Sequence, residues 1–231
     1  MLFFDPLYLV FALPALLLAL YAQMKVQSAY AKWQQVPNRR GYTGYETARA
    51  LLSAGQMGDV GVEGVPGKLS DHYDPRARLL RLSGDVANGR SVASLAIVAH
   101  EIGHAEQDAT NYLPLKLRSA IVPAVQIGAW VGPALFFLGF LLRITPLAYL
   151  GLIAFAATTV FSLVTLPVEL NASSRALAML RSNGLVTSEE EARGAKDVLT
   201  AAALTYVAAL VQSIMTLLYY VLLLSGGSRR R

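Results

Sequence analysis

Long apolar stretches separated by polar segments dominate the sequence. Four of these stretches reach the roughly 20 consecutive apolar residues that a helix needs to cross a bilayer. They cover about residues 1–23, 120–142, 147–168 and 199–224. The pattern therefore predicts a mostly α, integral membrane protein with four transmembrane helices.

The connections between the stretches predict how these helices follow one another. Arg143, Thr145 and Pro146 form a tight connection, so residues 120–168 are expected to form an antiparallel hairpin of the second and third transmembrane helices. The first stretch lacks the basic start and the A-x-A-like cleavage site of a signal peptide, which favours an uncleaved membrane anchor. Residues 225–231 are expected to form a C-terminal tail.

Two polar segments, 24–119 and 169–198, lie between the predicted spans. Because two spans separate them, both segments are expected on the same side of the membrane. The positive-inside rule places that side in the cytoplasm of a cell (inner or plasma) membrane, although the arginines at 229–231 oppose this orientation. The basic residues that favour it are Lys25, Lys32, Arg39, Arg40, Lys116, Arg118, Arg175, Arg181, Arg193 and Lys196.

The first polar segment carries signals for a small α+β lobe. Thr43, followed three residues later by Glu46, forms a capping-box pattern that predicts a helix over about 45–57. Glycines and prolines then separate two short apolar runs, 60–65 and 78–82, which are typical of strands. A turn is expected at Asp74-Pro75, between the strands, and we expect the sheet to be antiparallel.

Composition supports a membrane protein and excludes several kinds of site. Of 231 residues, 55% are hydrophobic and 15% charged, whereas about a quarter of a soluble domain is charged. The absence of cysteine excludes disulfides, thiolate zinc sites and a cysteine nucleophile. The net charge of +5 is spread over scattered lysines and arginines without interleaved aromatics, so no nucleic-acid partner is expected.

A helix predicted from Ser91 to about Asp108 contains the motif H-E-x-x-H, formed by His100, Glu101 and His104. Residues four apart lie on one face of a helix, so both imidazoles can reach a single zinc ion. Glu101 is rotated by about 100° from His100. It is therefore expected to act as the general base that takes a proton from the attacking water, rather than as a ligand.

A catalytic zinc needs a third protein ligand. Glu169 is the best candidate, because an ionisable residue at the end of a transmembrane helix is energetically costly and usually has a functional role. A glutamate on a second helix after H-E-x-x-H is also the ligand order of the gluzincin class of peptidases. Asp108, one turn after His104, is the competing ligand, and is otherwise expected near the ligands or in solvent.

Four further residues are candidates for supporting roles. His72 and Arg175 could contact the substrate or its oxyanion. His72 could equally be an ordinary turn residue, and Arg175 a basic residue that flanks a transmembrane helix. Asn171 and Ser173 could orient Glu169 or a ligating histidine through hydrogen bonds.

Several segments resemble the YugP-type neutral zinc metallopeptidases of bacterial membranes. The segments are 70–75, 88–91, 100–105 and 166–173, and the resemblance extends over nearly the whole chain. It implies a peptidase whose zinc is bound by His100, His104 and Glu169. A more distant similarity is to the HtpX peptidases and the CAAX prenyl proteases. In those proteins an aspartate that supports a histidine follows the glutamate ligand by four residues, where this chain has Ser173.

The sequence thus predicts a membrane-embedded zinc endopeptidase with one Zn²⁺ per chain. Its expected partners are a protein or peptide substrate, the lipid bilayer, and either a membrane partner protein or a second copy of the chain. The alternative is a non-enzymatic membrane protein that uses a structural zinc site as a scaffold. A transporter or channel is disfavoured, because the predicted spans lack a row of ionisable residues.

Overall fold

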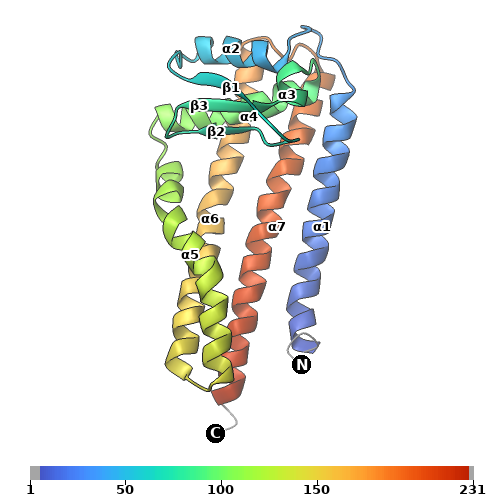
Figure 1. Cartoon of the computed structure of the whole chain (residues 1–231). Coiled ribbons are helices and arrows are strands. Elements are labelled where there is room, and N and C mark those ends of the chain that lie inside the picture. Colours follow the sequence, from blue (N-terminus) through green and yellow to red (C-terminus); the bar gives the residue numbers. More distant parts are fainter. Residues whose placement is uncertain (1–5, 229–231) are drawn as a thin grey trace. The chain divides into compact units, whose positions relative to one another are not determined.

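The computed structural model describes residues 6–228 and is mostly helical (Figure 1). Four helices are long and apolar enough to cross a membrane, as predicted: α1 (Pro6–Gln34), α5 (Leu113–Leu141), α6 (Thr145–Ser182) and α7 (Glu189–Ser228). The first five residues of the first predicted span and the three arginines of the predicted tail lie outside the described residues.

The long helices extend well beyond the predicted spans. Pro167 lies inside α6, which continues to Ser182, because membrane helices tolerate the loss of a single proline N–H. The connection to α7 is therefore short. There the Glu191 carboxylate accepts hydrogen bonds from the backbone N–H groups of Thr187 (2.8 Å) and Ser188 (3.1 Å) and caps the start of α7.

The backbone contacts divide the chain into two compact units. One unit comprises Met1–Ala22, Lys116–Pro167 and Thr205–Arg231, and the other comprises Gln23–Leu115 and Val168–Leu204. Parts of α1, α5, α6 and α7 belong to each unit.

In the first unit, glycines allow α5 and α6 to pack as the predicted hairpin. A Cβ atom at Gly132 would lie 2.8 Å from the backbone nitrogen of Phe155, and one at Gly151 would collide with the backbone of Phe136. Small residues let helix backbones approach closely in membranes, where helices pack without a hydrophobic driving force. The turn between them places Arg143 in the left-handed region, at φ 57°.

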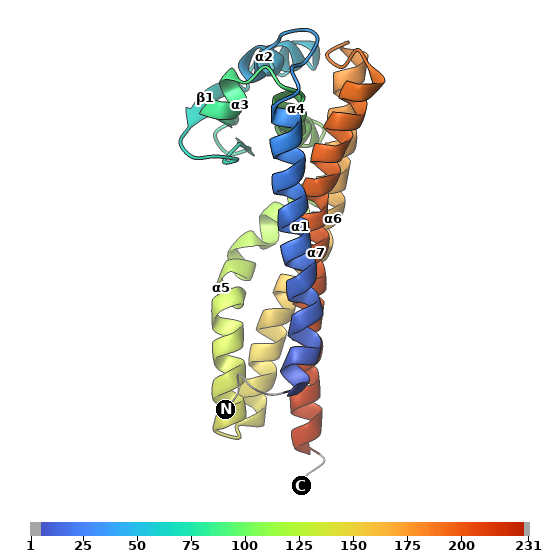
Figure 2. The ribbon, with the colours of Figure 1, turned by 90° about the vertical axis from the view of Figure 1, so that its right-hand side faces the viewer.

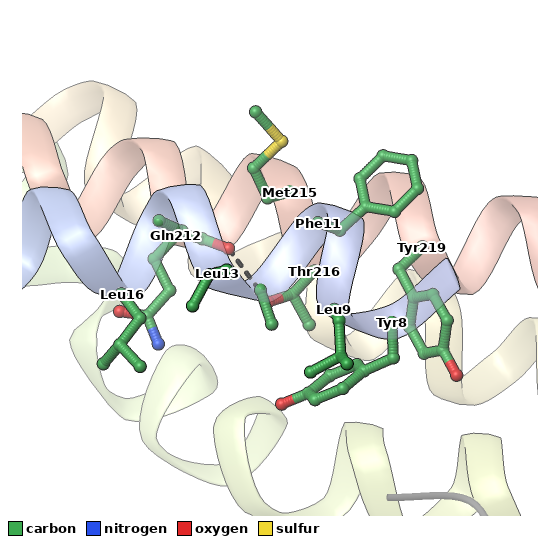
Figure 3. A pocket seen from close by; sticks show the side chains of 11 residues that line it. Tyr8, Leu9, Phe11, Leu13, Leu16, Gln212, Met215, Thr216 and Tyr219 are labelled. Carbon is green, nitrogen blue, oxygen red and sulfur yellow. Dashed lines mark hydrogen bonds between the residues drawn. The ribbon is translucent and has the colours of Figure 1, made fainter. Parts of the chain in front are cut away.

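The parts of α1 and α7 in the same unit run side by side (Figures 1 and 2). The rings of Tyr8 and Tyr219 meet edge to face, with their centroids 5.3 Å apart. A mainly apolar cavity of about 230 Å³ lies along this contact (Figure 3). At its edge the Thr216 hydroxyl donates to the carbonyl of Gln212 at 2.9 Å, so this hydroxyl is satisfied within its own helix.

The second unit contains a three-stranded sheet with the order β1-β3-β2. Its strands are β1 (Gly61–Val65), β2 (His72–Asp74) and β3 (Leu79–Ser83). The prediction of an antiparallel sheet is wrong in part, because β1 pairs with β3 in parallel and only β2 is antiparallel to β3.

The reason is an additional short strand, β2, between the two predicted ones. The turn predicted at Asp74-Pro75 joins β2 to β3, and the Asp74 carboxylate accepts from the backbone N–H groups of Arg76 and Ala77 at 3.0 and 3.2 Å. The chain therefore reverses between β1 and β2 and again between β2 and β3, so β3 runs alongside β1 in the same direction.

Three helices complete this unit: α2 (Gly44–Ala54), α3 (Gly84–Asn88) and α4 (Val92–Ala109). The predicted capping box of Thr43 and Glu46 is confirmed, and α2 ends at Ala54, three residues earlier than expected, with Gly55 as its C-cap. Ser91 caps α4 by accepting from the N–H of Ser94 at 3.1 Å. The first half of α4 forms the centre of the core, and its apolar side chains from Val92 to Ala99 are fully buried except for the partly buried Ile97.

Candidate metal centre

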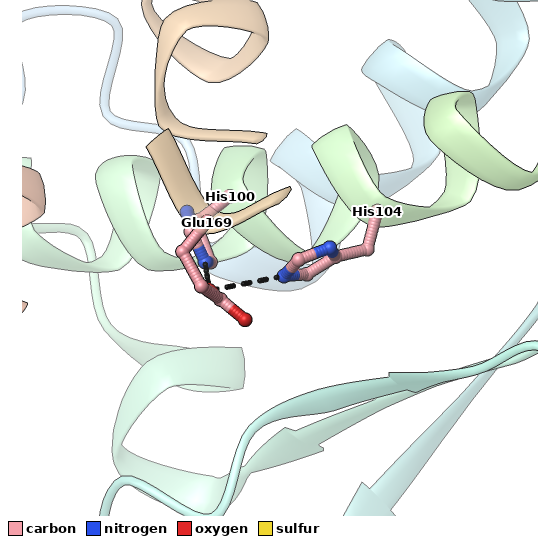
Figure 4. Close-up of side chains that lie close together, drawn as sticks. All are labelled: His100, His104 and Glu169. Atoms are coloured by element: carbon pink, nitrogen blue, oxygen red, sulfur yellow. Dashed lines mark hydrogen bonds and ion pairs between the residues drawn. The ribbon is translucent and has the colours of Figure 1, made fainter. Parts of the chain in front are cut away.

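Three potential metal ligands come together from two helices of the same unit. His100 and His104 lie on α4, and Glu169 lies on α6 (Figure 4). The Glu169 Oε2 atom is 3.2 Å from His100 Nε2 and 3.4 Å from His104 Nε2. Tetrahedral zinc with bonds of about 2.0–2.1 Å separates neighbouring ligand atoms by roughly 3.3–3.4 Å. The donor types and their spacing therefore fit one zinc ion.

Glu169 reaches the histidines because α4 and α6 approach one another closely. A Cβ atom at Gly103 would lie only 2.6 Å from the carbonyl oxygen of Ala172. The Glu169 side chain is consequently only 2% exposed. A carboxylate this deeply buried requires a compensating positive charge or hydrogen bonds, which a metal ion and the imidazoles can supply.

Each histidine is supported on the ring nitrogen that faces away from Glu169. The Ser173 hydroxyl lies 3.2 Å from His100 Nδ1, and the Gln107 side-chain oxygen lies 3.0 Å from His104 Nδ1. Metal-bound histidines commonly have such a partner on the second nitrogen, which fixes the orientation of the ring. Ser173 was predicted for this kind of contact, whereas Gln107 was not.

Glu101 lies outside the three-residue cluster and faces the sheet. Its Oε2 atom accepts a hydrogen bond from the backbone N–H of Tyr73, on β2, at 3.0 Å. Desolvation raises the pKa of the Glu101 carboxyl, and the nearby His100 and His104 act against this shift. The arrangement leaves Glu101 beside the candidate ligands without making it one of them.

The pKa of His104 is raised by its acidic neighbours. Burial alone would lower it, but the contact with Glu169 and the charge of Glu101 have the larger combined effect. The cluster is therefore a site with excess negative charge, which is suited to a cation.

The competing ligand Asp108 is engaged elsewhere. Its carboxylate accepts a hydrogen bond from the Tyr73 hydroxyl at 2.9 Å, and it is not part of the ligand cluster among the described residues. Burial and this hydrogen bond raise the pKa of Tyr73, so the phenol stays protonated and can donate. Tyr73 thus contacts α4 at two points, Glu101 and Asp108, a role that the sequence did not predict.

The two residues expected to contact substrate also lie outside the ligand cluster. His72 is exposed on β2, and its Nδ1 atom lies 2.8 Å from the carbonyl of Ser70. Arg175 donates from Nε to the Asn171 side-chain oxygen at 2.8 Å and forms an ion pair of 3.2 Å with Glu106.

Comparison with known proteins agrees with this geometry. Residues 8–225 match the model of a family described as "Putative neutral zinc metallopeptidase". The chain belongs to this family. It is 45% identical over 221 residues to the "Putative membrane protease YugP" of Bacillus subtilis (strain 168), a match that covers 96% of this chain and 98% of that protein. No solved structure gives a significant match.

The match confirms the resemblance that the sequence motifs indicated. A zinc metallopeptidase family implies zinc, and the His100, His104 and Glu169 cluster provides a place for it. The family description does not identify individual ligands, so those assignments depend on the geometry of this chain.

The ligand assignment predicts different outcomes for two acidic residues. We expect Glu169→Ala to lose most of the zinc that co-purifies with the detergent-solubilised protein, because it removes one of three ligands. Asp108→Ala is expected to retain wild-type zinc, since Asp108 contacts Tyr73 instead. Metal analysis of both variants by mass spectrometry checks this. Zinc retained by Glu169→Ala and lost by Asp108→Ala would reverse the assignment.

Proposed function

We propose that this protein is a zinc-dependent endopeptidase that cleaves membrane or membrane-proximal proteins. The observation that supports this most is the convergence of His100, His104 and Glu169, with Glu101 next to the first histidine on the same helix. The similarity to a family of zinc metallopeptidases, and to a protein named as a membrane protease, supports the same class of reaction.

When bound, zinc acts as a Lewis acid that polarises the substrate carbonyl and lowers the pKa of water. The chain's own residues would handle the proton. Glu101 accepts it from the attacking water and then donates it to the nitrogen of the leaving amine. Desolvation raises the pKa of the Glu101 carboxyl. The carboxylate is therefore a stronger base toward the attacking water, and it holds the proton until the leaving amine can accept it.

Strand β2 is a suitable place for an extended substrate. It is an edge strand of the sheet, and it lies against α4 through the hydrogen bond between Tyr73 and Glu101. Peptides commonly bind by adding a strand to such an edge. A substrate held there would run past Glu101, and the exposed His72 on the same strand could contact it or its oxyanion. A direct contact of Arg175 with substrate also stays a prediction.

The number of donors favours an enzyme over a structural zinc site. A structural site is closed by four protein ligands, whereas a catalytic site leaves one position for water or substrate. Among the described residues the cluster contains three. One zinc per chain is part of this proposal.

The orientation that we propose places the zinc site on the cytoplasmic side of the cell membrane. The support is the concentration of lysine and arginine in the two polar segments, among them Lys25, Arg39 and Arg193. A site on that side has access to cytoplasmic proteins and to the ends of transmembrane segments.

The central prediction concerns Glu101→Gln. We expect this variant to keep about one zinc per chain and to lose at least about 100-fold of its proteolytic rate, because it removes the general base and no ligand. Cleavage of casein and of a membrane-anchored reporter by the detergent-purified protein measures the rate. Glu190→Gln, at an exposed position in the first turn of α7, is the matched control and should cleave normally. Equal cleavage by wild type and Glu101→Gln would contradict the mechanism.

The absence of cysteine in the chain allows a clean test of orientation. Single cysteines at Ser53, exposed in α2, and at Thr145, the exposed first residue of α6, should be labelled from opposite sides of the membrane. We expect a membrane-impermeant maleimide to label Thr145→Cys in intact cells and Ser53→Cys only in inside-out vesicles. The reverse pattern would place the candidate site on the outer side.

A further inference from the structure

A buried chain of hydrogen bonds lies behind His104, on the side of the ring away from Glu169. Its central member is Gln107, which is fully buried. The Gln107 side-chain oxygen lies 3.0 Å from His104 Nδ1. Its nitrogen lies 2.8 Å from the carbonyl oxygen of Val168 and 3.0 Å from the side-chain oxygen of Asn171. Arg175 extends the chain by donating to that same Asn171 oxygen.

Two groups in this row of hydrogen bonds have a fixed role as donor or acceptor, and they determine the roles of the other groups. The Nε–H of Arg175 can only donate, so the Asn171 atom that faces it must be the oxygen. The backbone carbonyl of Val168 can only accept, so the Gln107 atom that faces it must be the nitrogen. Both hydrogens of the Gln107 amide are then used, one toward Val168 and one toward Asn171.

The orientation of Gln107 determines which nitrogen of His104 carries a proton. Since the amide nitrogen of Gln107 is turned toward α6, its oxygen faces His104 Nδ1 and can only accept. Nδ1 must therefore carry the hydrogen. In a neutral imidazole the other nitrogen then has the lone pair. That nitrogen, Nε2, is the one that points at Glu169 within the ligand cluster.

We propose that Gln107 is a positioning residue that holds His104 in the Nδ1–H tautomer, and that Asn171 and Arg175 fix the polarity of Gln107. The proposal rests on the proposed zinc site, because zinc binds the lone pair that this tautomer presents at Nε2. The opposite tautomer of His104 would require a flipped Gln107 amide. The Gln107 oxygen would then face the acceptor oxygens of Val168 and Asn171 and leave buried polar groups unpaired.

The two candidate histidine ligands differ in this respect. His100 Nδ1 faces the hydroxyl of Ser173, and a hydroxyl can either donate or accept. Ser173 therefore supports the ring of His100 without choosing its tautomer. His104 is fixed before any metal arrives, whereas His100 can adapt.

The same contacts give Arg175 a role that does not require it to touch substrate. Its guanidinium is held by the ion pair with Glu106 and lies 5.9 Å from the ring of Tyr112. These contacts keep its Nε–H aimed at Asn171. The influence of Arg175 on the metal centre would thus pass through Asn171 and Gln107.

The first readout is the tautomer itself, which needs neither zinc nor activity. The full-length chain is purified in detergent with ¹⁵N-labelled histidine, and its spectra are recorded at alkaline pH before and after zinc removal by a chelator. The chain has three histidines, so single substitutions assign them. We expect the proton of His104 on Nδ1 in wild type and a mixture of tautomers in Gln107→Leu. Glu190→Gln, at an exposed position in α7 outside this network, should match wild type.

The second readout is metal affinity, measured by competition with a chelator. Gln107→Leu is expected to bind Zn²⁺ about 10–100-fold more weakly, the usual effect of losing a partner behind a ligand. Asn171→Asp keeps the oxygen that accepts from Gln107 and Arg175 and should bind like wild type, whereas Asn171→Leu should weaken binding. Ser173→Ala should leave the tautomer of His104 unchanged. If Gln107→Leu does not fold, Asn171→Leu carries the same test.

A neutral His104 that carries its proton on Nε2 instead of Nδ1 in the metal-free wild type would overturn the proposal. So would an unchanged tautomer and unchanged zinc affinity in both Gln107→Leu and Asn171→Leu. Failure of the proposed function looks different, since a protein without zinc affinity or proteolytic activity could still show the expected tautomer.

Discussion

The candidate metal centre depends on one backbone contact, the approach of α4 to α6 at Gly103 and Ala172. A side chain at position 103 would meet the Ala172 carbonyl, so only glycine allows the helices to come this close. Glu169 lies three residues before Ala172 on α6, and at this separation it reaches the Nε2 atoms of both histidines. The same approach brings Val168 and Asn171 to Gln107. The contact of Gly103 with Ala172 therefore positions both Glu169 beside the histidines and the hydrogen-bond partners of Gln107.

The electrostatics of the site follow from what this contact buries. Two carboxylates, Glu101 and Glu169, lie beside two imidazoles with little exposure to water. With neutral imidazoles the cluster carries excess negative charge, and burying such charge is unfavourable unless a cation balances it. A divalent metal ion meets that need with the donor atoms already present. Gln107 and Ser173 contact the Nδ1 atoms of His104 and His100, so both Nε2 atoms are directed at Glu169.

Local periodicity explains which parts of this picture the sequence could predict. The four apolar stretches, the capping box at Thr43 and the H-E-x-x-H spacing are local patterns, and each corresponds to an element of the structure. Glu169 could be proposed as a metal ligand because a charged residue at the end of an apolar helix is unusual. Its contact with the histidines brings together residues 65 or more positions apart, and no local pattern specifies that pairing.

The parts that could not be predicted depend on tertiary contacts. Strand β2 has three residues, which is too short to show an alternating pattern, so the mixed sheet was missed. A helix was expected at Glu169, but its continuity with the third span was not predicted, because the sequence becomes polar after residue 168 while its helix-forming residues continue to Ser182. No sequence pattern indicated a role for Gln107, because the function of a buried amide depends on the groups that it contacts in the folded protein.

The most direct test of the central claim is X-ray absorption spectroscopy at the zinc edge on the detergent-purified protein. The account predicts two imidazole nitrogens and additional oxygen ligands, all at about 2.0–2.1 Å. Replacing Glu169 should change the oxygen shell while leaving the imidazole signal recognisable in any zinc that remains bound. A zinc shell without imidazole, or no bound zinc in wild-type protein to which zinc has been supplied, would contradict the assignment of His100, His104 and Glu169 as the metal centre.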